Sequence, residues 1–142
     1  MSKVKKGFLK VFIFLLFLLI ISLPGCNIKV VNTEEKREDV SFAIVSKECL
    51  PDSLAKLMEE RKENTVKLTY MDQGKRYVVV GYGKQKTSGY SIYIKEFYKT
   101  GNALYVDTCL MGPQDKEKIK KVESYPMIVL QISEMGMPVV FK

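Results

Sequence analysis

Hydrophobic residues follow three different patterns along this chain, and the first is an unbroken run. It extends from Val11 to Leu23, behind a lysine-rich start, with Ser22 as its single polar member. Its 13 residues fall short of the roughly 20 that a membrane-spanning helix needs. A basic start, an apolar core and a small residue before a break are typical of a secretory signal. We therefore expect residues 1–25 to be a signal peptide. An uncleaved anchor stays an alternative, since extending the run back to Phe8 takes in one charge, Lys10.

The second pattern has the period of an α-helix. Leu54, Leu57, Met58 and Arg61 fall at positions i, i+3, i+4 and i+7, which gives one apolar stripe that ends on a long aliphatic stem. The Pro-Asp-Ser sequence at 51–53 suits the first turn of a helix, and an asparagine at position 64 suits its end. The pattern predicts one helix whose stripe packs against the core.

The third pattern has the period of a β-strand and begins at Thr65. Polar and apolar residues alternate, or form short β-rich runs bounded by turn residues. Three consecutive valines, 78–80, are typical of a central strand covered on both faces. The predicted strands are residues 40–45, 65–70, 76–80, 90–95, 104–108, 126–132 and 138–141. One helix and a run of antiparallel strands predict an α+β fold, with the helix packed on one face of a mainly antiparallel sheet.

The domain organisation follows from these patterns. Residues 26–39 start with a short apolar patch and become a charge run, Glu-Glu-Lys-Arg-Glu-Asp, at 34–39. We interpret them as a tether, although the patch at 28–31 is also compatible with a first strand. Residues 40–142 are then a single α+β domain.

The signal ends on a motif that suggests lipidation. The sequence Leu-Pro-Gly-Cys at 23–26 resembles the lipobox of bacterial lipoproteins, in which the cysteine thiol accepts a diacylglyceryl group. The small Gly25 lets a signal peptidase approach the bond before Cys26, whereas Pro24 departs from the commoner small or hydroxyl residue. The resemblance implies a protein anchored by lipid at Cys26 on the extracytoplasmic face of a bacterial membrane. Stable anchoring needs more than one acyl chain.

Charge and composition narrow the functional classes. The net charge is +7, but four of the 23 basic residues lie in the leader, so 19 basic and 16 acidic residues remain. These alternate in sequence rather than cluster, which argues against a nucleic-acid surface. The chain contains no histidine, which excludes Ser-His-Asp and Cys-His nucleophiles and histidine metal ligands. We expect no metal and no cofactor.

Few residues offer catalytic chemistry. Glu96 and Asp107 could oppose each other across the turn at 100–102, as a glycosidase pair would in residue type alone. Such pairs usually face solvent, so we expect no enzyme. Cys49 and Cys109 remain beside the lipidated cysteine, and they could form a disulfide or stay as free thiols.

The region with the most features is residues 77–106. Its glycine-bounded loop at 83–89 leads into a strand instead of a helix, so it is not a P-loop. Seven tyrosines fall in the predicted sheet region, where a tyrosine-lined face could hold a partner or a glycan. Tyrosine is also a good strand former.

Four short motifs follow one another in the second half of the chain: Gly-Lys at 83–84, Thr-Ser-Gly-Tyr-Ser-Ile at 87–92, Tyr-Pro at 125–126 and Pro-Val-Val-Phe at 138–141. In this order they resemble the PrcB C-terminal domain family, which is named for a lipoprotein subunit of a subtilisin-like protease complex. The resemblance covers residues 77–142. Ser88 departs from the pattern, which usually has a glycine there. The resemblance implies a non-catalytic, lipid-anchored subunit that binds or stabilises an extracytoplasmic protease.

The leading hypothesis is therefore an interaction protein that binds a partner by a sheet edge or by its central loop. The predicted contact residues are Lys84, Thr87, Ser88, Gly89, Tyr90 and Tyr93. Two alternatives stay open. One is a binding module for a cell-wall or small-molecule ligand, and the other is a protease inhibitor acting through the same loop.

Overall fold

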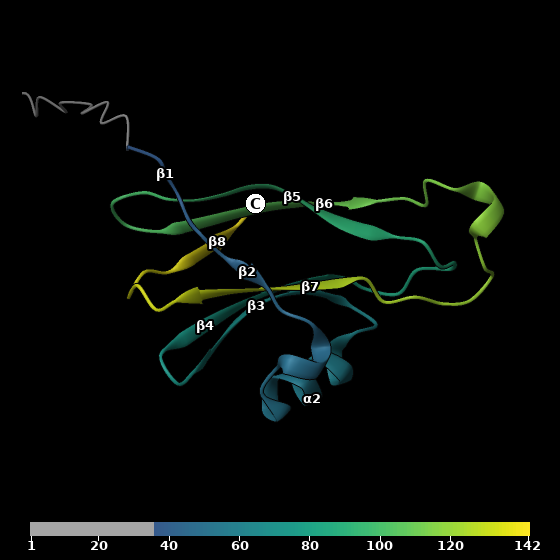
Figure 1. Cartoon of the computed structure of the whole chain (residues 1–142), viewed down its shortest axis with the longest axis horizontal. Coiled ribbons are helices and arrows are strands. Elements are labelled where there is room, and N and C mark those ends of the chain that lie inside the picture. The colour runs from purple at the N-terminus through teal and green to yellow at the C-terminus, as the bar shows by residue number, and fades with distance from the viewer. Residues whose placement is uncertain (1–35) are drawn as a thin grey trace, which may run out of the picture. The chain divides into compact units, whose positions relative to one another are not determined.

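A computed structural model describes residues 36–142, apart from the side chain of Lys116, and shows two β-sheets and one α-helix there (Figure 1). The predicted signal peptide, the lipidation site Cys26 and residues 26–35 of the predicted tether lie outside the described residues. Within the described part of the chain, no helix is long and apolar enough to cross a membrane.

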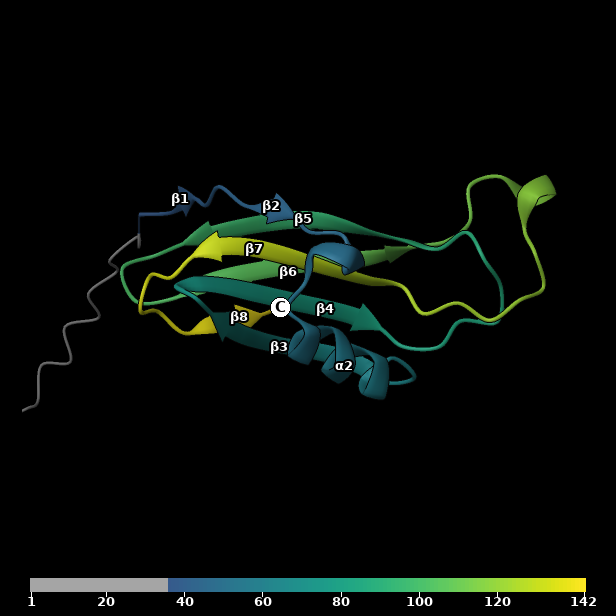
Figure 2. The same cartoon turned by 60° about the horizontal axis from the view of Figure 1, so that its bottom comes forward.

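The strands divide into two four-stranded sheets that lie face to face (Figures 1 and 2). Sheet A has the order β1 (Glu38–Asp39), β5 (Ser91–Lys99), β6 (Leu104–Met111) and β8 (Val139–Phe141). Sheet B has the order β2 (Ala43–Ile44), β7 (Met127–Ser133), β4 (Lys75–Tyr82) and β3 (Thr65–Asp72). Neighbouring strands are antiparallel except for β6 and β8, which are parallel. The predicted α+β class is confirmed, but the prediction of one sheet was wrong.

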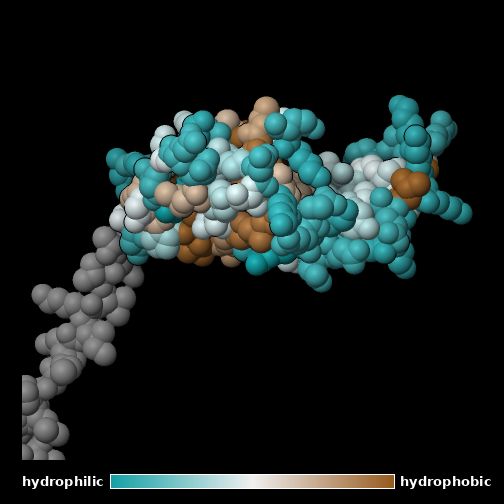
Figure 3. Space-filling model, turned by 90° about the horizontal axis from the view of Figure 1, so that it is seen from below, coloured by the Kyte–Doolittle hydropathy of each residue, from teal (hydrophilic) through white to brown (hydrophobic). Residues whose placement is uncertain are grey.

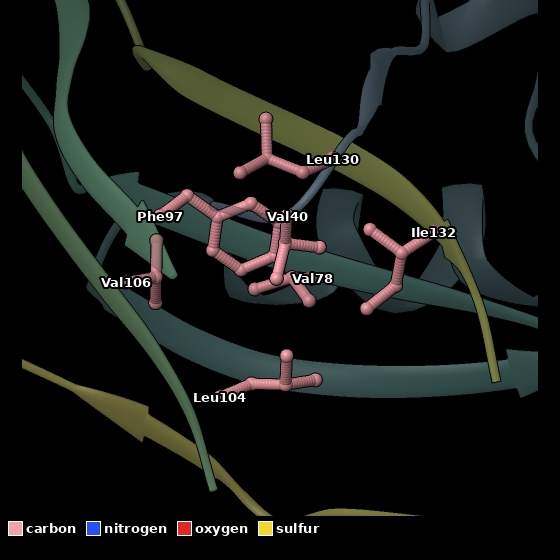
Figure 4. Packing of buried hydrophobic residues seen from close by; sticks show 7 residues of the cluster. All are labelled: Val40, Val78, Phe97, Leu104, Val106, Leu130 and Ile132. Atoms are coloured by element: carbon pink, nitrogen blue, oxygen red, sulfur yellow. The ribbon is translucent and has the colours of Figure 1, made fainter. Parts of the chain in front are cut away.

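The main core lies between the two sheets. Val78 of β4 and Leu130 of β7 point from sheet B toward Phe97 and Leu104 of sheet A (Figure 4). All four are buried, and Val78, Leu104 and Leu130 are fully so. A single sheet could not form this core, because the core requires the strands after residue 90 to pack over β4 as a second sheet.

The second core lies between sheet B and the helix α2 (Asp52–Arg61). Alternate residues of β4 and β7, Val79 and Val129, point toward Leu54 and Met58 of α2. The predicted stripe is thus confirmed at its two buried positions, while Arg61 is exposed. The valines at 78–80 are all buried, as expected for a strand covered on both faces.

A β-bulge sets which side chains of β5 face the core. Ile94 pairs with Thr108, but Glu96 pairs with Asp107, so Lys95 is an extra residue in the strand. Both Lys95 and Glu96 are exposed, and Phe97 is buried. A regular strand would have placed Phe97 on the solvent face.

The first two strands differ from the prediction: both are short, and β1 begins before the predicted first strand. Glu38 and Asp39, which the charge pattern assigned to the tether, form β1 and pair with Lys99 and Tyr98. The predicted strand at 40–45 is reduced to β2, while Val40 is buried in the main core. Two short 3-10 helices complete the elements: η1 (Lys47–Cys49) and η2 (Lys116–Lys118).

An ion pair fixes the connection from β7 to β8. Arg76 of β4 donates through Nε to Oε2 of Glu134 at 2.7 Å and through Nη2 to Oε1 at 2.5 Å, and it also donates to the carbonyl of Met137. The Gly136 N–H donates to the same carboxylate at 2.6 Å. The chain is therefore held at the point where it passes from sheet B to sheet A.

Candidate partner-binding surface

The predicted contact loop, residues 83–90, is hydrogen-bonded to a second loop. Gln85 and Ser124 exchange main-chain hydrogen bonds of 2.8 and 3.1 Å. Ser88 N–H donates to the carbonyl of Lys120 at 3.0 Å, and Lys120 N–H donates to Ser88 Oγ at 2.9 Å. Residues 83–90 are thus joined to residues 112–125, and we call the pair the two-loop tip.

A glycine and two hydroxyl side chains hold the tip together. Gly89 has φ +92°, and a Cβ there would lie 3.1 Å from Cβ of Pro113. The position therefore requires glycine for its backbone conformation and for the close approach of Pro113. Ser124 Oγ donates to the carbonyl of Thr87 at 2.6 Å. Ser88, the residue that departs from the family pattern, uses its hydroxyl to bind the second loop.

The tip lies at one end of the two-sheet body, and residue 36 enters at the other end (Figures 1 and 2). Both loops leave the sheets at this end, because one follows β4 and the other connects β6 to β7. A molecule that contacts the tip therefore meets the part of the folded unit farthest from where the chain enters it.

The surface of the tip is rich in lysine. Lys84 lies 2.6 Å from the Glu123 carboxylate, and this hydrogen bond raises the pKa of Lys84 and lowers that of Glu123. Lys118 pairs with Asp115 at 2.9 Å. Among the described side chains, the exposed Lys86, Lys120 and Lys121 have no ion pair. The tip therefore presents free positive charge.

The predicted contact residues divide between two surfaces. Lys84, Thr87, Ser88, Gly89 and Tyr90 all belong to the tip, where Tyr90 is half-buried. Tyr93 is 60% exposed and lies on the outer face of sheet A, paired with Cys109. Tyr93 is thus beside the tip rather than part of it.

The tyrosines do not form one open face. Tyr77 is buried in the core under α2, and the hydroxyl of Tyr82 lies 2.9 Å from Thr108 Oγ1. Tyr98 stacks on Tyr105 with 5.0 Å between ring centroids. Of the tyrosines in the described residues, only Tyr93 is largely exposed. The surface on which a glycan-binding hypothesis depended is therefore missing from the described part of the chain.

The cysteines and the acidic residues do not combine into a disulfide or a metal site in the described part of the chain. Cys49 and Cys109 are both free thiols, so the disulfide considered above does not form. Cys49 is in η1 and Cys109 is in β6, on different sides of the folded unit. Among the described residues, no three Cys, Asp or Glu side chains are placed to hold a metal ion.

The carboxylate pair occupies the predicted register. Glu96 pairs with Asp107 across β5 and β6. Each carboxylate has a cationic neighbour, Lys142 at 3.5 Å from Glu96 and Lys95 at 3.5 Å from Asp107. Neither lines the groove described next.

A groove beside α2 is the feature that the sequence did not indicate. It has a volume of about 480 Å³ and lies between α2, β2 with η1, and the start of β7. Figure 3 views the face of the molecule that carries α2, where hydrophobic side chains are open to the surface among hydrophilic ones. The lining residues are Ile44, Val45, Lys47, Leu50, Met58, Glu59, Lys62, Tyr125, Met127, Ile128 and Val129.

Three charged residues form the rim of this groove. Glu59 accepts from Lys47 Nζ at 2.9 Å and also from Lys62 Nζ. The hydrogen bonds from Lys62 and Lys47 lower the pKa of Glu59 to about 2. Lys62 Nζ also lies 4.8 Å from the centre of the Tyr125 ring. Two lysines share one carboxylate, so the rim has a net charge of one positive unit.

Part of the chain matches a known protein family. A family model described as PrcB C-terminal matches residues 76–133, which confirms the resemblance that the motifs indicated. The matched segment contains β4 from its second residue on, all of β5, β6 and β7, and both loops of the tip. It contains one wall of the groove, Tyr125 to Val129, while the wall from α2 precedes it. No curated protein and no solved structure matches the chain.

Proposed function

We propose that this protein is a lipid-anchored, non-catalytic interaction subunit at the extracytoplasmic face of a bacterial membrane, and that its two-loop tip binds a partner protein. The observation that carries the proposal is that the family match includes both loops of the tip. The lipobox-like sequence ending at Cys26 supports the anchor.

The tip suits binding because it is already ordered. Main-chain and side-chain hydrogen bonds join its two loops at Gln85, Ser88 and Thr87. A preformed surface loses less conformational entropy on association than a flexible loop does. Its free lysines, Lys86, Lys120 and Lys121, favour an acidic surface on the partner and would accelerate the encounter.

The partner that the family favours is an extracytoplasmic protease. In such a complex the protease would supply the chemistry, and this chain would hold it at the membrane. The sequence has no histidine, and the described residues contain no group of three Cys, Asp or Glu that could hold a metal ion.

A pull-down from native membranes tests the binding function. Detergent-solubilised wild-type protein should retain a stoichiometric partner protein. Lys86→Glu with Lys121→Glu reverses two free charges on the tip and should reduce capture about tenfold. The matched control, Lys56→Glu with Lys75→Glu, makes the same charge change away from the tip, on α2 and at the start of β4, and should capture as wild type does. Absence of a stoichiometric partner, or equal capture by the tip variant, would refute the proposal.

The anchor is tested separately. Cys26→Ser removes the thiol that would accept the lipid, so the variant should be released from membranes or remain unprocessed. Mass spectrometry of the mature protein reports both results. An identical mature mass, apart from the substitution itself, would exclude lipidation at this residue.

A further inference from the structure

One edge of sheet B is open next to the groove. The strand β2 covers only part of β7: Ala43 pairs with Gln131 and Ile44 with Leu130. Val45 N–H then donates to the Val129 carbonyl at 3.0 Å, after which the chain turns away into η1. In residues 36–142, no further strand continues β2 alongside the beginning of β7.

The main chain of Met127 points toward this open edge. In a strand, the N–H and C=O groups of successive residues point alternately to the two sides. The Pro126 carbonyl accepts from Tyr82 N–H of β4, and the Val129 carbonyl accepts from β2. The main-chain N–H and C=O of Met127 point to the same side of β7 as those of Val129, so both groups face the groove. These groups have the arrangement of an edge strand, whose free N–H and C=O can pair with an added strand.

The groove supplies the apolar contact and the charge beside that edge. Leu50, Met58 and Val129 belong to the hydrophobic part of its lining, together with Ile44, Val45, Met127 and Ile128. Its volume, about 480 Å³, lies in the range of clefts that enclose ligands, roughly 300–1,000 Å³. Lys47 and Lys62 stand at the rim with the single carboxylate of Glu59 between them. An occupant therefore gains most from an apolar side chain and one negative charge.

We propose that the groove beside α2 binds an extended peptide segment with apolar and acidic side chains, which adds to β7 as a strand at Met127. An apolar side chain of the peptide packs on Met58, and an acidic one lies at Lys47 and Lys62. An extended peptide fits better than a small molecule because the open main-chain donor and acceptor of β7 match a second main chain. The inference rests on the proposed function in one respect: the peptide belongs to the partner protein.

Selection from a random library tests the chemistry. Full-length protein in dodecyl maltoside is presented with displayed linear peptides of ten random residues. The enriched peptides should carry apolar residues at alternate positions and an acidic residue near one end. A consensus without an acidic residue, or one with helical spacing, would overturn the proposal.

Binding of an enriched, fluorescein-labelled peptide is then measured by anisotropy. Lys47→Glu with Lys62→Glu should raise the dissociation constant about tenfold or more. Lys56→Glu with Lys75→Glu is the matched control and should leave it unchanged. None of the four lysines is buried, since Lys62 is half-buried and the other three are exposed, so circular dichroism should show folded protein in both variants. Equal affinity of the two variants would contradict the assigned site.

Hydrogen exchange tests the mode of binding. On addition of the same peptide, exchange of the Met127 amide should slow at least tenfold, since it becomes part of a ladder. The Val79 amide, within the central strand β4, should not change. An unchanged Met127 amide in the peptide complex would exclude strand addition. Protection that instead appears without peptide and rises with protein concentration would assign the edge to a second copy of this chain and refute the proposal.

The two proposals can fail independently. If the native partner is captured equally by wild type and by the Lys47→Glu, Lys62→Glu variant, the groove is not its binding site, while the interaction function stands. If the peptide binds as described but no stoichiometric partner is recovered from membranes, the groove stands and the interaction function fails.

Discussion

The two sheets have the same number of strands but are covered in different ways. Sheet B packs on sheet A through Val78 and Leu130 and on α2 through Val79 and Val129. Sheet A packs on one side only, and its outer face meets solvent at Tyr93. The sequence reflects this difference, because β4 has a continuous buried run while the first half of β5 alternates.

On the outer face of sheet A, long cationic side chains cover the aromatic residues, whereas a helix covers the outer face of sheet B. The Arg37 guanidinium lies 4.7 Å from the centre of the Tyr98 ring, and Lys142 Nζ lies 5.0 Å from it. Tyr98 is buried even though it is on the outer side of the sheet, because these side chains and Tyr105 cover it. Aliphatic stems and cation–π contacts can thus cover an aromatic pair without a second layer.

The largest effect should come from the contact that the two sheets share. Leu130→Ala opens a cavity at a fully buried position between them, and should destabilise the protein by about 2–5 kcal/mol. Both sheets should unfold together in urea, in one transition. Val140→Ala, at an exposed position of β8, is the control and should change stability by less than about 0.5 kcal/mol.

A smaller effect is expected under the helix. Met58→Ala removes a side chain that touches sheet B on one side and the groove on the other. The loss should be about 2 kcal/mol, the low end for such a truncation, because the site is already open to water. Urea titration measures it. A loss equal to that of Leu130→Ala would contradict the difference between the two cores.

The connection between the sheets should make stability depend on pH. Burial raises the pKa of Glu134, but hydrogen bonds from Gly136 N–H and Arg76 outweigh it, so the pKa lies below its ordinary value of 4.5. A lowered folded-state pKa means that the stabilisation is complete above the unfolded pKa and is lost as the pH falls through the folded one.

Glu134→Gln tests this connection. The variant should melt at a lower temperature than wild type at neutral pH. The difference between the two proteins should shrink as the pH is lowered from about 5 toward 2. A constant difference over that range would show that the Glu134 carboxylate does not contribute through its charge.

The smallest effect should follow deletion of Lys95. The bulge places both Lys95 and Glu96 outside, so removing one residue leaves Ile94 and Phe97 facing the core in a regular strand. Stability should change by about 0.5 kcal/mol or less, as measured by urea titration. Deletion of Tyr93 is the contrast, because it interrupts the regular part of β5 and should be much more destabilising.

The elements could be predicted better than their assembly. The stripe of α2 and the valines of β4 have periods that depend on local burial, and both were identified. The division into two sheets could not be found, because the pairing of β1 with β5 and of β8 with β6 depends on contacts far apart in sequence. The bulge at Lys95 is hidden for a related reason, since two exposed charged residues in a row are compatible with several registers.

The candidate site was predicted in part. The glycine and hydroxyl residues of the first loop were identified, but its second loop was interpreted only as a charged connection. The hydrogen bonds of Ser88 and Thr87 with that segment have no local signature. The groove beside α2 was missed because its walls come from three distant parts of the chain, around Ile44, Met58 and Met127.

The positions of β1 and β8 have a consequence for how the chain acquires its structure. The β3–β4 and β5–β6 hairpins can form as soon as each is synthesised, since their partners are adjacent in sequence. Sheet A gains its two outer strands from opposite ends of the folded unit, and β8 has to pass beside β6 after β7 is in place. Such long-range pairing is slow. Sheet A therefore stays incomplete until β8 has been synthesised and has paired with β6, even where both hairpins have already formed.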